Sequence, residues 1–363
     1  MILHRYIARR FAIVLASVWA VFFALLGLVD LIEQARRYGA DTDGIGPLLG
    51  LTLLSVPAEL YRILPLIVIV AALALFLGLA RSSEMVVIRA SGRSALRMLT
   101  APVAVALLVG LAGVAVMNPI VAATSSAFEA RVDDLRGRDR ILALPGSGVW
   151  LRQGADGAQT VIHADRTSLD GTDLTGATFH VFAADGTPLR RIEAASATLG
   201  PGAWTLRDAR TWPLDAPNPE ASATTAARLE VPSTLTAERI RDSFGAPSAI
   251  PVWELPAFIA QLRAAGFTAR RHVVHLQMEL AAPLFLAAMV LIAAAFTLRH
   301  QRGGNTGLLV LLAVLVSFGA YFIRNFARIL AETGQVPPIL AAWAPPVAAA
   351  CLALGLLLHL EDG

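Results

Sequence analysis

The sequence contains no lysine, so all 30 of its Lys or Arg positions are arginine. This absence excludes two kinds of chemistry, because a Walker A loop needs a lysine on the nucleotide phosphates and Schiff-base catalysis needs a lysine amine. Cysteine is nearly absent as well. The one residue, Cys351, can form neither an intramolecular disulfide nor a cysteine metal cage. The formal net charge of +3 is too small to indicate nucleic-acid binding.

Charged residues are also scarce, at 16% against 56% hydrophobic residues, whereas soluble domains have about 25% charged residues. This composition predicts a membrane protein. A helix of about twenty apolar residues spans a bilayer. Six stretches are long enough: Phe11–Leu31, Pro47–Ala80, Leu99–Ala123, Leu276–Leu298, Thr306–Ile323 and Ile339–Leu360. The first is longer than the apolar region of a signal peptide and is followed by no A-x-A cleavage site, so we interpret it as a retained anchor.

The second stretch is too long for one plain span. Pro57, Glu59, Arg62 and Pro65 predict that it is divided. The division leaves Ile63–Leu79 as a clean apolar core, preceded by an interfacial turn or a tilted extension.

The short connections on the two sides of the membrane differ in arginine content, with nine on one side and four on the other. Because arginine-rich loops stay in the cytoplasm, the richer side is predicted to be cytoplasmic. Both termini then lie in the cytoplasm. The long segment 124–271 lies outside it.

Segment 124–271 has a different character from the spans. Apolar runs of strand length, such as Val149–Leu151 and Phe179–Phe182, alternate with turn pairs such as Asp170-Gly171 and Pro201-Gly202. This pattern predicts an antiparallel sandwich or jelly-roll-like domain over 144–235. A short helical connection follows, with Leu255, Ile259 and Leu262 on one face. The predicted fold is therefore a six-helix membrane protein with an inserted all-β domain, divided into 1–123, 124–271 and 272–363.

The connection from Arg81 to Ser94 is unusual for a loop because it contains the apolar run Met85–Ile88. A serine at its start can cap a short helix near 82–93, Glu84 suits the first turn, and Gly92 can end it. Such a helix could dock a soluble partner. An amphipathic helix resting in the lipid headgroups fits the periodicity equally well.

This connection resembles the coupling-helix signature of the LptF/LptG permeases, which export lipopolysaccharide from the inner membrane with a separate ATPase. Other stretches agree with the family: Leu3–Ile7, Leu54–Pro57, Leu64-Pro65 and Val336–Pro338. Between the two paralogues, Glu33–Arg37 is more similar to the LptG side. The resemblance implies that Glu84, Arg89 and Gly92 couple the chain to the ATPase.

The resemblance also implies the partners. These are an LptB-like ATPase dimer, an LptF-like paralogous permease, an LptC-like bitopic protein and an LptA-like periplasmic bridge. ATP and Mg would be used by the ATPase, and this chain would hold no cofactor and catalyse no reaction. The missing lysine is consistent with that division of labour. The β-domain would lie in the periplasm, where apolar residues such as Trp150, Phe179, Val181 and Trp204 could form a groove for acyl chains or simply a core.

A set of arginines lies at the non-cytoplasmic ends of the predicted spans, although arginine generally prefers the cytoplasmic side of a membrane. The set comprises Arg36, Arg37, Arg62, Arg131, Arg324 and Arg328. Arginine presents a bidentate fork to phosphate, so we hypothesise that these residues bind the phosphates of lipopolysaccharide at the mouth of an apolar cavity. The alternative is arginines that extend to the interface or pair with Asp30, Glu33 or Glu332.

His272, His275 and Glu279 have helical spacing that imitates a metal site, but the segment leads straight into a span. Interfacial capping or pairing is the favoured interpretation. Two other functions remain open at this level. One is a regulatory or mechanical membrane protein whose ATPase drives the β-domain without moving lipid, and the other is an anchor that displays a β-module.

Overall fold

The computed structural model describes residues 2–39, 44–82, 84, 95–136, 149–155, 158–167, 172–183, 186–233, 235–236, 247–264, 268–297 and 306–361. The chain forms two compact units. One contains residues 1–128, 248–252 and 273–363, and the other contains residues 129–247 and 253–272.

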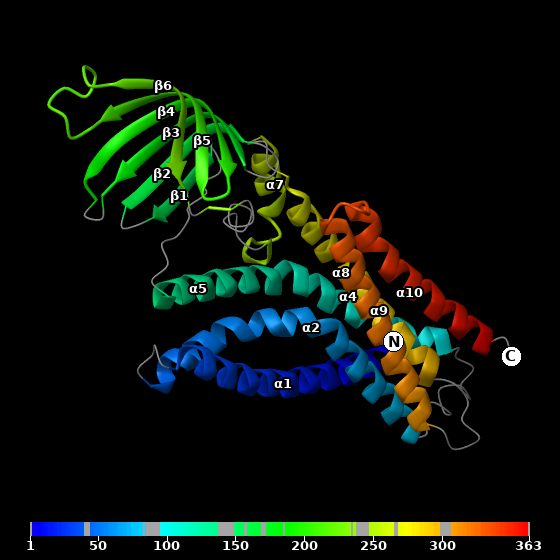
Figure 1. Ribbon diagram of the computed structural model, residues 1–363. Helices are drawn as coiled ribbons and strands as arrows, with labels where there is room; N and C mark the ends of the chain where they lie inside the picture. The colour runs from blue at the N-terminus through cyan, green and yellow to red at the C-terminus, as the bar shows by residue number, and fades with distance from the viewer. Residues whose placement is uncertain are drawn as a thin grey trace. The chain divides into compact units, whose positions relative to one another are not determined.

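Within these described ranges, six helical segments are long and apolar enough to cross a membrane, in agreement with the six predicted spans. They are α1 (Ile2–Tyr38), α2 (Ile45–Arg81), α4 (Ala95–Ala112) with α5 (Asn118–Arg136), α8 (Arg270–Thr297), α9 (Thr306–Glu332) and α10 (Pro338–Glu361). A π-helical turn, Gly113–Met117, joins α4 to α5. Figure 1 shows α1 lying along α2, and the two helices pack against each other.

Helix α2 continues without a break through Pro57 and Pro65, so the predicted interfacial turn is wrong. A spanning helix tolerates proline because neighbouring helices and local adjustments satisfy the freed carbonyls. Its 37 residues extend about 55 Å, well beyond a hydrocarbon core of about 30 Å. The predicted extension of the second span is thus helical.

The core of the helical unit is formed by α2 and α8. Over an 18-residue apolar stretch of each helix, 56% of the residues of α2 and 78% of those of α8 are buried inside the protein. The corresponding shares are 6% for α1 and 11% for α9. Helix α8 contacts α4 very closely: a Cβ added to Gly110 would lie 2.9 Å from Cβ of Pro283. Small residues at helix crossings permit such an approach. Helices α1 and α9 therefore present most of their apolar surface outward.

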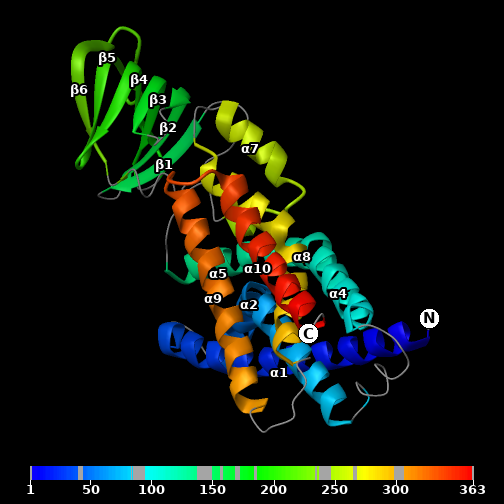
Figure 2. The ribbon, with the colours of Figure 1, turned by 90° about the vertical axis from the view of Figure 1, so that its right-hand side faces the viewer.

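The second unit contains one antiparallel sheet of six strands in sequence order, each beside its neighbours in the chain. The strands are β1 (Val149–Ala155), β2 (Ala158–Thr167), β3 (Asp173–Phe182), β4 (Pro188–Gly200), β5 (Ala203–Pro213) and β6 (Thr224–Pro232). The inserted all-β domain is confirmed, and among the described strands its order is that of a meander. Figure 2 shows the sheet twisted and curved. Pro201-Gly202 forms the predicted turn between β4 and β5, with Gly202 at φ 80°.

One face of the sheet holds the core of this unit. Phe179 and Trp204 are fully buried with ring centroids 6.1 Å apart, and Val181 is buried too. Trp150 instead packs on its cross-strand partner His163, on the face opposite Leu151 and Ile162. The four residues considered as one apolar groove therefore do not share a face. Three of them are core residues.

A short helix, α7 (Leu255–Ala264), follows the sheet in the chain. Its expected apolar face is correct, because Leu255, Ile259 and Leu262 are all buried. A 3-10 turn, Pro247–Ala249, precedes it.

Candidate functional site

Glu84 is held by side chains from two helices. Its Oε1 accepts hydrogen bonds from Arg10 Nη1 at 2.7 Å and Ser82 Oγ at 2.8 Å, and its Oε2 accepts one from Tyr6 OH at 3.1 Å. Tyr6 and Arg10 are four residues apart on α1 and so share one helix face. Ser82 directly follows α2, and its Oγ also lies 3.0 Å from the carbonyl oxygen of Gly78. We call Tyr6, Arg10, Ser82 and Glu84 the Glu84 clasp.

The clasp fixes the charge of Glu84. The hydrogen bond from Arg10, followed by that from Ser82, holds the pKa of the Glu84 carboxyl below its usual value. The two charged side chains are each about 30% exposed, at 30% for Arg10 and 32% for Glu84. Glu84 is therefore an ionised carboxylate that stays accessible to solvent. The other predicted coupling residues, Arg89 and Gly92, lie outside the described part of the chain.

Arg36 and Arg37, at the other end of α1, share one acidic partner. Arg36 Nη2 lies 2.9 Å from Glu33, and Arg37 Nε also donates to Glu33. The side chains are 75% and 59% exposed. Two guanidinium groups on one carboxylate leave a net charge of +1 and free donors facing outward. The pairing foreseen as an alternative is present, and it leaves capacity for an anion.

Two more of the six arginines also pair with neighbours on their own helices. Arg328 Nε lies 2.8 Å from Glu332, and Arg62 lies 3.4 Å from Glu59. Both arginines are largely exposed. Arg131 is exposed on the part of α5 that belongs to the sheet-containing unit. A headgroup role for these three arginines stays a prediction.

Arg324 differs from the others because it points into the helical unit. Its Nη2 donates to the carbonyl of Met278 at 3.1 Å, and its guanidinium lies 5.1 Å from the ring centroid of Phe285. Its Nε is buried without a hydrogen-bond partner. A headgroup role for Arg324 remains a prediction, and its contacts are those of a residue inside the helix packing.

Arg324 belongs to a buried polar cluster that the sequence did not reveal. Glu279 on α8 is buried, accepts a hydrogen bond from Tyr61 OH, and interacts with the charge of Arg324. Asn118, directly after the π-helical turn, bonds to Glu279 and accepts from the backbone N–H of Val252 at 2.8 Å. Tyr321 adds a further contact by donating to the carbonyl of Arg62 at 3.4 Å. The available signal was an acidic residue inside an apolar helix, which marks a paired or functional position.

The two histidines near Glu279 on α8 make different contacts. His275 Nε2 lies 3.9 Å from Glu279 Oε1, while the ring of His272 packs on Phe258 with centroids 5.0 Å apart. Within the described ranges, no three His, Cys, Asp or Glu side chains gather as metal ligands would. Glu279 is engaged by Tyr61 instead.

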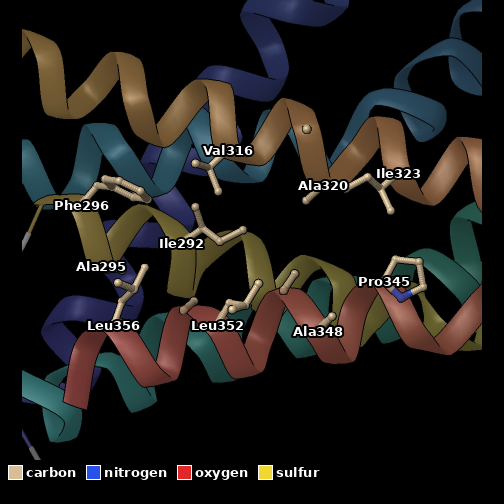
Figure 3. A pocket seen from close by; sticks show the side chains of 13 residues that line it. Ile292, Ala295, Phe296, Val316, Ala320, Ile323, Pro345, Ala348, Leu352 and Leu356 are labelled. Carbon is tan, nitrogen blue, oxygen red and sulfur yellow. The ribbon is translucent and has the colours of Figure 1, made fainter. Parts of the chain in front are cut away.

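An apolar cavity of about 240 Å³ lies between α8, α9 and α10. Figure 3 shows Ile292 and Phe296 of α8 and Val316 of α9 pointing into it, opposite Leu352 and Leu356 of α10. The space exists because many of the side chains on the facing surfaces of these helices are small. The small residues are Ala295, Gly319, Ala320, Ala348, Ala349 and Ala353. An environment without charged side chains suits hydrocarbon only.

Comparison with known proteins decides the family. The model of the lipopolysaccharide export system permease LptF/LptG family matches residues 5–359. The chain belongs to the LptF/LptG family. It is similar to the lipopolysaccharide export system permease protein LptG of Escherichia coli K12, with 24% identity over 99% of this chain and 98% of that protein. It is also similar to the lipopolysaccharide export system permease protein LptG of Haemophilus influenzae, with 24% identity over 94% of each chain. Like that family, it is a multi-pass inner membrane protein.

Proposed function

We propose that this LptF/LptG-family chain is the LptG-like permease subunit of an ATP-driven lipopolysaccharide exporter. It extracts lipopolysaccharide from the outer leaflet of the inner membrane and passes it to a periplasmic bridge. Family membership over residues 5–359 supports this proposal, as do the six apolar helices and the inserted sheet. The observation that carries it is the pair Arg36 and Arg37, which leaves exposed positive charge at one end of a spanning helix.

ATP hydrolysis belongs to a partner in this account, because the chain has no lysine for a Walker A loop. The partner is an LptB-like ATPase dimer, which uses ATP and Mg and contacts the cytoplasmic segment at Glu84, Arg89 and Gly92. An LptF-like permease completes the membrane pair. Both termini lie in the cytoplasm, as the arginine bias of the short loops predicts. The sheet lies in the periplasm, where an LptC-like protein and an LptA-like bridge receive the lipid.

Headgroup binding follows from the chemistry of the arginines. Lipid A phosphates present the charge and geometry that guanidinium groups bind in bidentate fashion. Arg36 and Arg37 are the principal binding residues, and Arg62, Arg131, Arg324 and Arg328 add positive charge. Acyl chains require apolar surface, which α1 and α9 expose along most of their lengths. When the ATPase drives these apolar helices together, the space for the acyl chains would close and the lipid would be expelled.

Charge reversal at the arginine pair tests the proposal. The variant Arg36→Glu with Arg37→Glu is purified with its partners, and lipopolysaccharide that copurifies is quantified per complex. We expect a loss of about tenfold or more, because each lost charged hydrogen bond is worth about 1.5–3 kcal/mol. The matched control is Arg190→Glu with Arg228→Glu, two exposed arginines of the sheet. Equal lipid in the two variants would contradict the proposal and favour a membrane protein that moves no lipid.

A further inference from the structure

Glu84, the residue proposed to contact the ATPase, is already bound within its own chain. Within the described part of the chain, three donors reach its two oxygens, and two of them come from α1 rather than from the neighbouring end of α2. Arg10 Nη1 also donates to Tyr6 OH at 2.9 Å, and its guanidinium lies 5.9 Å from the ring centroid of Tyr6. The contact is therefore a small network in which Tyr6 and Arg10 hold each other in place.

Of the arginines described at the start of α1, only Arg10 bonds to Glu84. Arg9 is exposed on the same helix, one position before Arg10, and Arg5 is exposed as well. General attraction between the basic start of α1 and an acidic residue would not select Arg10. Helix phase selects it, because positions 6 and 10 lie beside the buried residues Ile7 and Phe11, at the edge of the packed face and within reach of Glu84.

The packing of α1 is tightest toward its two ends. Its fully buried residues are Ile7, Phe11, Leu15, Gln34 and Tyr38, whereas Val18, Phe22 and Leu26 in the middle are only partly buried against the core. At the far end, Asp30 accepts hydrogen bonds from Ser55 of α2 at 2.6 Å and from Gln34 at 3.3 Å. Because α1 is one unbroken helix of about 55 Å, a displacement of one end is transmitted along it to the other.

We propose that Arg10, supported by Tyr6, is a positioning residue that passes displacement of Glu84 to α1 and so to Arg36 and Arg37. This inference rests on the proposed function, because it assumes that the ATPase acts at Glu84 and that α1 holds the lipid headgroup. Glu84 then has two sides: its exposed surface faces the ATPase, and its hydrogen bonds hold α1. When the ATPase dimer closes, the carboxylate moves and the clasp carries the start of α1 with it.

The test measures coupling in the full complex of this chain, its paralogous permease and the ATPase. ATP hydrolysis and lipopolysaccharide release are followed in the same preparation for the wild type, Arg10→Gln and Arg9→Gln. We expect Arg10→Gln to copurify with the ATPase and keep its hydrolysis within about twofold. Lipid released per ATP should fall about tenfold, the scale of one charged hydrogen bond. Arg10→Lys should restore most of the coupling, and Arg9→Gln should behave as wild type.

Other outcomes separate this inference from the proposed function. A ratio of release to hydrolysis in Arg10→Gln equal to that of Arg9→Gln overturns the role of Arg10 while leaving the exporter intact. A wild-type complex that hydrolyses ATP and releases no lipid overturns the proposed function. In the double variant Arg10→Gln with Glu84→Gln, the loss should be no greater than for Glu84→Gln alone, because Arg10 acts through that carboxylate. Additive losses contradict the inference.

Discussion

Gly110, where α4 crosses α8, gives a sharp test of the helix packing. A Cβ at this position would lie 2.9 Å from Cβ of Pro283 and 3.2 Å from its backbone nitrogen, and closer still to its Cα. Ordinary contacts of this kind are 3.4–4 Å long. Pro283 offers backbone and a rigid ring, so it cannot rotate away. Gly110→Ala therefore requires the two helices to separate by about 1 Å, and overpacking of this kind costs about 1–3 kcal/mol.

The helix propensity of alanine would partly hide this cost, since Ala replaces Gly in a helix with a gain of about 0.5–1 kcal/mol. Gly27→Ala is the matched control, because nothing lies within 4 Å of a Cβ at Gly27 on α1. Both variants gain the same propensity, so the difference between them isolates the clash. At about 2–4 °C per kcal/mol, Gly110→Ala should unfold roughly 2–12 °C below Gly27→Ala in detergent. Equal melting temperatures would refute the close crossing of α4 and α8.

Three further predictions concern other parts of the chain. Because the folded pKa of Glu84 is depressed, its ionic contacts should stabilise the protein above the ordinary carboxyl pKa and be lost as pH falls through the folded value. The melting-temperature difference between wild type and Glu84→Gln should thus be constant from pH 8 to about 5 and vanish in stronger acid, and a difference that grows on acidification contradicts the clasp. Glu279→Leu should destabilise the protein by about 1–3 kcal/mol, measured by thermal unfolding, because it leaves the Tyr61 hydroxyl without its acceptor and removes the charge that interacts with Arg324. Adding Arg324→Met should recover part of that loss, and no recovery would show that Glu279 and Arg324 are independent. Gly202→Val should lower sheet stability by about 1–2 kcal/mol, since φ of 80° suits glycine alone, whereas Gly200→Val in the adjacent strand, where the chain has no positive φ, should cost less.

Much of the architecture follows from local sequence because its causes are local. Apolar length predicts the spans, and Pro201-Gly202 predicts a turn whose second residue needs positive φ. The i, i+3 and i, i+4 spacing of Glu33, Arg36 and Arg37 likewise predicts their pairing. These features depend on residues within one or two helical turns of each other.

What sequence could not supply was contact between distant segments. Tyr61 and Glu279 are separated by 218 positions, so nothing local indicates their hydrogen bond. Arg324 and Arg328 share a face by spacing, yet one points into the helix packing and the other pairs with Glu332. Strand alternation assigns residues to two faces of a sheet but does not tell which face is buried. It therefore could not separate Trp150 from the core aromatic residues. The interfacial turn predicted before Ile63 is wrong because the tolerance of a helix to proline depends on its neighbouring helices.

The central claim is that the far end of α1 holds the lipopolysaccharide headgroup before ATP drives the lipid out. The most direct measurement is photocrosslinking to lipopolysaccharide from a probe at position 37 in the assembled complex, with and without ATP. A probe at position 2, an exposed residue at the opposite end of the same helix, is the control. We expect an adduct at position 37 that forms without ATP and diminishes during turnover, and none at position 2. No adduct at position 37, or equal adducts at both ends of α1, would contradict the account.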